Sequence, residues 1–95
     1  MRFGTVAVRG ASMEPRLRDG DFLVVRRRAR VRPGALVVAR FRDHPGLLVV
    51  KRAVRPADGG WELASDNASA PGALRGLGDV EAVVLVRYWP AGRRS

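Results

Sequence analysis

The hydrophobic positions of this chain fall in short, valine-rich runs, and glycine, proline or aspartate separates one run from the next. Valine is β-branched and favours strands, whereas the separating residues favour turns. No apolar repeat of helical period continues beyond two turns. The pattern therefore predicts a chain of strands and loops, with strands over residues 5–8, 22–26, 35–41, 47–55, 61–64 and 81–88.

These elements predict an all-β fold, in the form of a small, highly curved sheet or partly open barrel. The 95 residues make one domain, with a core over about residues 5–89 and a polar tail over 90–95. A chain of this length buries only roughly 60–65% of its unfolded surface, so it builds one modest core. Residues 12–17 are expected to form a loop or a single helical turn, and residues 65–78 have the composition of a loop.

The composition excludes several classes of protein. The chain has no cysteine, so it forms no disulfide and no thiolate metal site, and we expect no metal or cofactor. None of its apolar runs approaches the about 18–20 residues that cross a bilayer. The first nine residues are too few and too polar for a signal peptide. We therefore expect a cytoplasmic protein without a membrane anchor.

The chain is strongly basic, with a net charge of +9, and its arginines are densest between Arg26 and Arg32. A basic surface attracts polyanions, so one alternative is a non-enzymatic, nucleic-acid-binding β-barrel. Zinc-finger spacing, a helix-turn-helix pattern and a strand rich in aromatic residues are all missing from the sequence. We therefore expect no nucleic-acid partner, and a solvated turn is the simpler interpretation of the cluster.

Only one of the eighteen basic side chains is a lysine, Lys51. Arginine stays protonated, whereas a desolvated lysine can lose its proton near neutral pH. The alternation of a strand places Leu47, Val49, Lys51 and Ala53 on one face, so the lysine lies among apolar neighbours. Two other interpretations stay open: a lysine that extends from a sheet edge to solvent, and a chance remnant of an arginine-rich composition.

The segment Gly10-Ala11-Ser12-Met13-Glu14-Pro15 ends a predicted strand and opens a tight turn. A glycine two positions before the serine allows the backbone a close approach. Such a turn suits a nucleophile whose neighbouring N–H groups stabilise an oxyanion. The only histidine, His44, lies in a Pro-Gly turn, so a Ser-His-Asp triad is not expected. A serine with a lone lysine indicates Ser-Lys dyad chemistry instead.

Several blocks recur in the order of a known superfamily. They are Ser12-Met13-Glu14-Pro15, Leu17-Arg18-Asp19-Gly20-Asp21, Arg32-Pro33-Gly34, Val49-Val50-Lys51-Arg52 and Ser65-Asp66-Asn67. As a set they resemble the type I signal peptidase and LexA-like superfamily of Ser-Lys proteases, peptidase families S24 and S26. The resemblance implies a soluble serine endopeptidase of that superfamily's catalytic-core fold.

The resemblance also implies roles for individual residues. Ser12 is then the nucleophile and Lys51 the general base. The Ser12 N–H, helped by Gly10, forms the oxyanion hole. Met13 lines the substrate cleft, although a place in the core is an equal alternative. Three further residues are expected to be structural near the site: Asp66, Asn67 and Arg75.

Within the superfamily the chain most resembles the small proteases that mature nickel-type superoxide dismutase. It shares with them a Val50-Lys51-Arg52-Ala53-Val54 block and a closing Arg87-Tyr88-Trp89-Pro90 block. The resemblance implies a protein substrate, the N-terminal prosequence of the dismutase precursor. Another signal-peptidase-like processing protease is the alternative. A self-cleaving repressor needs a cleavable segment before its serine, and eleven residues precede Ser12, so we do not expect one.

The sequence departs from the family pattern around the dyad. Arg16 replaces a usual threonine, Ser65 a usual glycine, and Pro71 the serine that helps to orient the lysine. The usual aspartate of a loop pair with Arg75 is replaced by Ala73. The dyad is intact, but the sequence predicts that its supporting shell is incomplete at Pro71. It leaves open what orients Lys51, and it does not give the oligomeric state.

Overall fold

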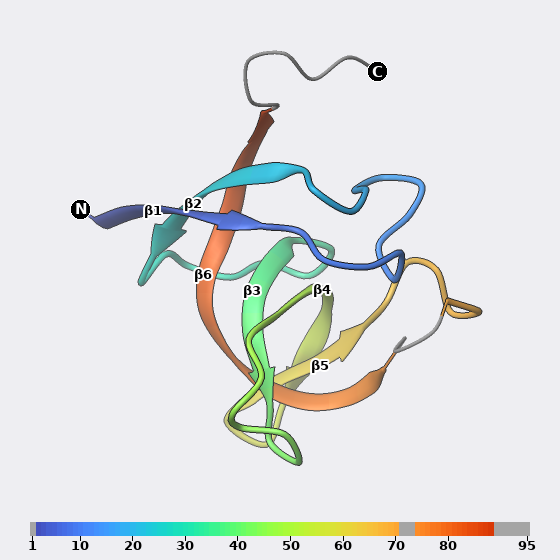
Figure 1. Cartoon of the computed structure of the whole chain (residues 1–95). Coiled ribbons are helices and arrows are strands. Elements are labelled where there is room, and N and C mark those ends of the chain that lie inside the picture. Colours follow the sequence, from blue (N-terminus) through green and yellow to red (C-terminus); the bar gives the residue numbers. More distant parts are fainter. Residues whose placement is uncertain (1, 71–73, 89–95) are drawn as a thin grey trace.

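The computed structural model describes residues 2–70 and 74–88, which form six strands in one antiparallel sheet (Figure 1). The described residues include no helix, and so none long and apolar enough to cross a membrane. The all-β prediction is confirmed: the sheet is strongly curved and closes only in part. The strands are β1 (Arg2–Ala7), β2 (Phe22–Arg27), β3 (Leu36–Phe41), β4 (Val49–Ala57), β5 (Gly60–Ala64) and β6 (Arg75–Tyr88).

The strand order is β1-β2-β6-β3-β4-β5, and β5 also pairs with β6. The last four strands of the chain therefore form a closed ring, while β2 and β1 extend the sheet from β6 (Figure 1). Successive parts of β6 serve three partners: residues 75–78 pair with β5, 78–83 with β3 and 82–88 with β2. Among the described strands, β1 alone has a single partner, β2.

The curvature of β6 has identifiable causes. The register shifts at two places, which leaves Glu81 and Leu85 without an opposite residue. Bulges of this kind bend a strand. At Gly78 the strand is held between β5 and β3, and a Cβ there would lie 2.6 Å from the carbonyl oxygen of Arg40. The prediction of a loop was wrong for residues 75–78, because pairing on both sides fixes a glycine-rich segment as strand.

The apolar side chains form two clusters, one on either side of β3. Val38 of β3 belongs to the first cluster, whereas its neighbours Val37 and Ala39 belong to the second. This split follows from the alternation of side chains along a strand. The first cluster contains Val8, Met13, Leu17, Leu23, Val25, Val38 and Ala82. The second, inside the ring, contains Val37, Ala39, Phe41, Ala53 and Leu63.

The boundaries of β4 differ from those that the sequence predicts. Leu47 and Leu48 precede the strand and are 53% and 42% exposed, so the prediction that the strand begins there was wrong. At its other end the strand continues past its predicted end at Arg55 to Ala57. Asp58 and Gly59 form the turn with φ of 48° and 78°, the conformation that tight hairpins need. The expected tail lies outside the described residues, and the single domain stays a prediction.

Candidate active site

Ser12 lies in a short turn that follows β1. The Leu17 N–H donates to the Met13 carbonyl at 2.9 Å, which closes the single helical turn that the sequence allows. The side chains of Met13 and Leu17 are almost fully buried in the first cluster. Ser12 is only half-buried, because its neighbours anchor the turn and leave its hydroxyl at the surface of the core. Met13 thus has the core position that the sequence left as an alternative.

The segment after β5 holds this turn in place. The Asn67 backbone N–H donates to the Ser12 carbonyl at 2.7 Å, and its side-chain amide donates to the Ala11 carbonyl at 3.2 Å. The Asp66 carboxylate accepts two hydrogen bonds from Arg52, at 2.6 and 3.2 Å. Asp66 and Asn67 therefore connect the serine turn to β4, the strand that carries the lysine.

Lys51 is 3% exposed and lies on β4, opposite Val37 of β3. Ala53 and Val49, two positions away on either side, pack in the second cluster, whereas Val50 packs against the first. The strand alternation is therefore as the sequence predicts. Burial lowers the pKa of the Lys51 ammonium from its usual 10.5, because desolvation disfavours the charged form.

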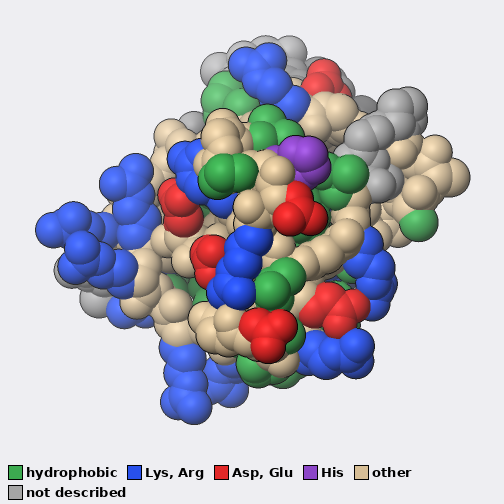
Figure 2. Space-filling model, turned by 90° about the horizontal axis from the view of Figure 1, so that it is seen from below, with side chains coloured by type: hydrophobic (Ala, Val, Ile, Leu, Met, Phe, Trp, Pro, Cys, Tyr) green, Lys and Arg blue, Asp and Glu red, His purple; other side chains and the backbone are tan. Residues whose placement is uncertain are grey.

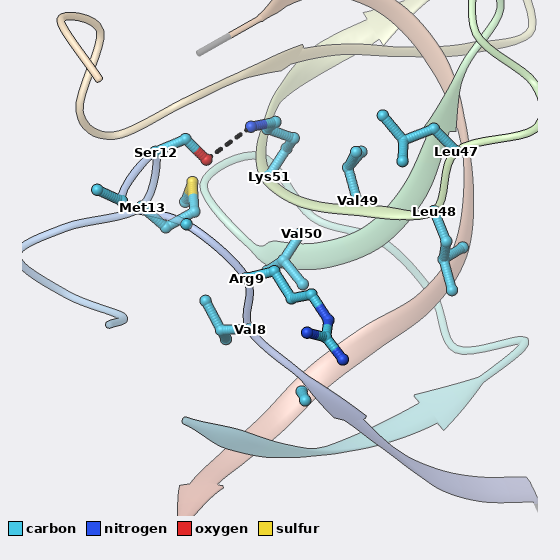
Figure 3. Close-up of a pocket in the computed structure, with 12 residues that line it drawn as sticks. Val8, Arg9, Ser12, Met13, Leu47, Leu48, Val49, Val50 and Lys51 are labelled. Carbon is cyan, nitrogen blue, oxygen red and sulfur yellow. Dashed lines mark hydrogen bonds between the residues drawn. The ribbon is translucent and has the colours of Figure 1, made fainter. Parts of the chain in front are cut away.

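The structure brings the serine and the lysine together. Lys51 Nζ lies 2.8 Å from Ser12 Oγ, across the space between the turn and β4 (Figure 3). In the ammonium form Nζ donates this hydrogen bond; in the neutral form its lone pair can accept the Ser12 proton. This is the relation between nucleophile and base that a Ser-Lys dyad needs.

A second serine, Ser65, holds the lysine amine. Its Oγ lies 2.9 Å from Lys51 Nζ, and its own O–H donates to the Leu74 carbonyl at 3.1 Å. Since a hydroxyl has one proton, Ser65 Oγ faces Nζ as an acceptor. The sequence predicts that a serine contact to the lysine is missing at Pro71, a residue outside the described part of the chain. Ser65 gives Lys51 a serine contact from a different position.

Sequence reasoning missed the role of Ser65, although the hairpin register contains the signal. Because Arg52 pairs with Ala64 in the antiparallel hairpin of β4 and β5, the next residues, Lys51 and Ser65, lie beside each other. The Ser65 hydroxyl could have been assigned to the lysine only if this register had been known.

The backbone around Ser12 offers a donor for an oxyanion. The Ser12 N–H has no acceptor among the residues that the structure describes. The Gly10 N–H, by contrast, donates to Asp19 Oδ1 at 2.8 Å, so it is not free to assist. Gly10 contributes its backbone conformation, with φ of 82°. Asp21, in the nearby turn, is buried and accepts a hydrogen bond from the Arg18 N–H at 2.9 Å.

A groove opens in front of the two side chains. Its volume is about 330 Å³, and it lies between residues 7–13 and residues 47–51. Met13 lines this groove as well as the core. Arg75 does not join the site: it pairs with Glu62 on the β5–β6 ladder. His44 lies in an exposed turn. No three His, Asp or Glu side chains group into a possible metal site in residues 2–70 and 74–88.

Comparison with known proteins agrees with a peptidase-type hydrolase. The chain matches a protein-family model described as Peptidase S24-like over residues 3–76, which covers most of the sequence. The protein therefore belongs to the Peptidase S24-like family. Among curated proteins the search found no match. The matched segment includes Ser12, Lys51 and Ser65.

Proposed function

We propose that this protein is a serine endopeptidase in which Ser12 is the nucleophile and Lys51 the general base. The observation that carries the proposal is the 2.8 Å distance between Nζ and Oγ, in a buried setting that lowers the lysine pKa. A base must lie within hydrogen-bond reach of the proton that it removes, and it must be able to lose its own. The distance of Lys51 from Ser12 supports the first condition, and the lowered pKa of its ammonium supports the second. The family match supports a peptidase function.

In the proposed mechanism neutral Lys51 accepts the Ser12 proton as Oγ attacks the scissile carbonyl carbon. The Ser12 N–H donates to the oxyanion of the tetrahedral intermediate. The Lys51 ammonium then gives its proton to the leaving amine, and an acyl-enzyme remains. Lys51 next takes a proton from the attacking water and returns it to Ser12 as the acid product leaves. Throughout these steps Ser65 positions the amine.

The substrate that we propose is the N-terminal prosequence of a nickel-type superoxide dismutase precursor. We propose that the cleavage takes place in the cytoplasm. The support is the resemblance of the Val50–Val54 and Arg87–Pro90 blocks to those of the maturation proteases of that enzyme. The groove between residues 7–13 and 47–51 has room for an extended peptide. The prosequence of another exported or processed protein is the alternative substrate.

The test is incubation with the dismutase precursor, read by mass spectrometry of the two products. Ser12→Ala and Lys51→Arg should each lower kcat by at least about 10³-fold. Ser12→Ala removes the nucleophile, and Lys51→Arg keeps the charge but leaves a side chain that cannot act as a base. His44→Ala is the control and should cleave at the wild-type rate. Retained cleavage by Lys51→Arg contradicts the dyad. If the protein cleaves other proteins but not this precursor, the proposed substrate is contradicted and the proposed dyad is not.

A further inference from the structure

A second cavity, of about 290 Å³, lies next to the groove in front of Ser12, and Leu48 lines both. The second cavity runs along residues 4–6 of β1 and reaches Arg27 at the end of β2. We call the two neighbouring cavities the hollow; together they extend from the Ser12–Lys51 pair to Arg27.

The far end of this hollow is strongly positive. Arg27 lies over Gly4, where an added Cβ would come within 3.6 Å of its guanidinium. Arg2 is opposite Arg27 in the ladder. We call four exposed residues the basic end: Arg2, Arg26, Arg27 and Arg28. Within residues 2–70 and 74–88 none of the four forms an ion pair, whereas Arg40, Arg42, Arg52, Arg55 and Arg75 all do.

The space-filling view shows the same asymmetry. Lys and Arg side chains gather at its left side without acidic neighbours, whereas towards the centre and right of that face basic and acidic side chains lie together (Figure 2). One carboxylate, Glu81, lines the second cavity. It is already paired, because Arg40 Nε donates to it at 2.6 Å. The charge that a ligand meets at this end is therefore positive.

A further cation lies along the path. Arg9 lines the first cavity and forms no ion pair with a described residue. In Figure 3 its side chain extends away from Ser12 and Lys51. The hollow thus has apolar walls, from Val6, Val8, Leu48 and Val50, with arginines at its middle and its end.

The occupant that fits this hollow is an extended peptide. β1 pairs only with β2 among the described strands, so the N–H and C=O groups of its other edge can bind an added chain. Neither cavity has an aromatic side chain in its lining, so nucleic-acid bases would find no stacking surface. Carboxylates are the side chains that a guanidinium binds best in a peptide.

We infer that the substrate lies along β1 and that Arg27 recognises an acidic side chain about five to eight residues from the scissile bond. The distance follows from the chain: Gly4 in β1 lies five residues before Arg9, or about 17 Å along an extended peptide, and Ser12 is three residues further. The inference rests on the proposed function, because the Ser12–Lys51 pair defines the scissile bond. It adds a specificity-determining residue to that function.

The experiment measures binding, which does not need turnover. The Ser12→Ala protein is titrated into fluorescein-labelled peptides of about twelve alternating valine and serine residues. The peptides carry two aspartates at the N-terminal end, two at the C-terminal end, or asparagines in place of all four. One of the two acidic peptides should bind about fivefold more tightly than the asparagine peptide at low salt. Adding Arg27→Gln should abolish this preference, and adding Arg30→Gln, which removes a charge outside both cavities, should keep it.

Several outcomes decide the question. No preference for either acidic peptide, or an equal loss with Arg27→Gln and Arg30→Gln, overturns the inference. The inference is also overturned, in favour of a nucleic-acid ligand, if a fluorescein-labelled oligothymidine binds more tightly than either acidic peptide and this binding depends on Arg27. If the protein prefers acidic peptides but the wild type cleaves no substrate, the proposed peptidase activity is contradicted and the proposed peptide-binding groove is supported. Cleavage without acid preference contradicts the groove alone.

Discussion

At the scale of single residues, the lysine amine has two oxygen partners with different consequences. In the proposed mechanism, Ser12 is the group with which Lys51 exchanges a proton. Ser65 cannot compete for that role, because its only proton is committed to the Leu74 carbonyl. A hydrogen bond from Nζ to Ser65 stabilises the ammonium and fixes its direction, so it opposes part of the effect of burial on the pKa.

The rate of the wild-type enzyme should rise with pH. Only neutral Lys51 accepts a proton, so kcat/KM should increase through the pKa of the free enzyme, which burial places below 10.5. Ser65→Ala removes an acceptor from the charged form, so the pKa should fall further and this limb should move to lower pH. The plateau should fall about 5- to 30-fold as the amine loses its orientation.

The control for this experiment is Ser65→Thr, which keeps the hydroxyl and should keep most of the activity and the wild-type pH limb. Both profiles are measured as initial rates on one substrate from pH 6 to 10.5 (about the range in which the lysine titrates). A Ser65→Ala enzyme that is merely less stable, with an unmoved limb, would show that Ser65 has no positioning role.

At the scale of elements, β6 determines the shape of the sheet. Its glycine-rich start lets β5 and β3 approach from both sides, and its two bulged residues turn it towards β2. Gly78 is the tightest of these positions, since a Cβ there would overlap Leu63 Cδ1 as well as the backbone of Arg40. The ring therefore depends on a position without a side chain.

Gly78→Ala should lower the free energy of unfolding by about 2–3 kcal/mol, because the backbone of β3 must shift to admit the methyl group. Gly46 is the matched control: a Cβ there meets nothing within 4 Å, and Gly46→Ala should change stability by less than about 0.5 kcal/mol. Urea denaturation followed by circular dichroism measures both. Equal stabilities for the two variants would contradict the assignment of Gly78 as the tight point.

The same element shows what the sequence could and could not predict. Each strand predicted from the valine runs overlaps an observed strand, although β1 begins earlier, at Arg2, than the predicted residue 5. The strand alternation placed Lys51 on the correct face of β4. The start of β6 was taken for a loop because Gly76 and Gly78 have low strand propensity, and their strand conformation comes from partners on other strands. Ser65 was missed for a similar reason: its place beside Lys51 depends on a hairpin register. The local hydrophobic pattern therefore predicts the strands, whereas the arrangement of the site depends on how the strands pair with one another.

At the scale of the whole molecule, the two apolar clusters share strands and so should not unfold separately. β3 contributes to both clusters, and β6 pairs with strands on both sides. The proposed dyad spans the same division, because Ser12 follows β1 and Lys51 is on β4. If the part that contains the first cluster separated from the part that contains the second, Ser12 and Lys51 would move apart. The site would then be lost even while the strands of each part stayed folded.

Hydrogen exchange should show this coupling. The slowest amides of β2 and of β4 should exchange with the same free energy, within about 0.5 kcal/mol, because both report global unfolding. Gly78→Ala should lower both values equally, although the substitution lies in the ring. A variant that lowers only the values of β4 would show that the ring opens independently of β1 and β2.

The open edge of β1 also has a consequence for how the protein behaves at high concentration. An unpaired strand edge can add a strand from a second copy of the same chain, and this is a common start of aggregation. Here the basic end lies at one end of that strand, where Arg2 is opposite Arg27, so two copies that approach edge to edge there bring like charges together. We therefore expect these unpaired arginines to oppose self-association, and a polyanion that neutralises them to weaken that protection.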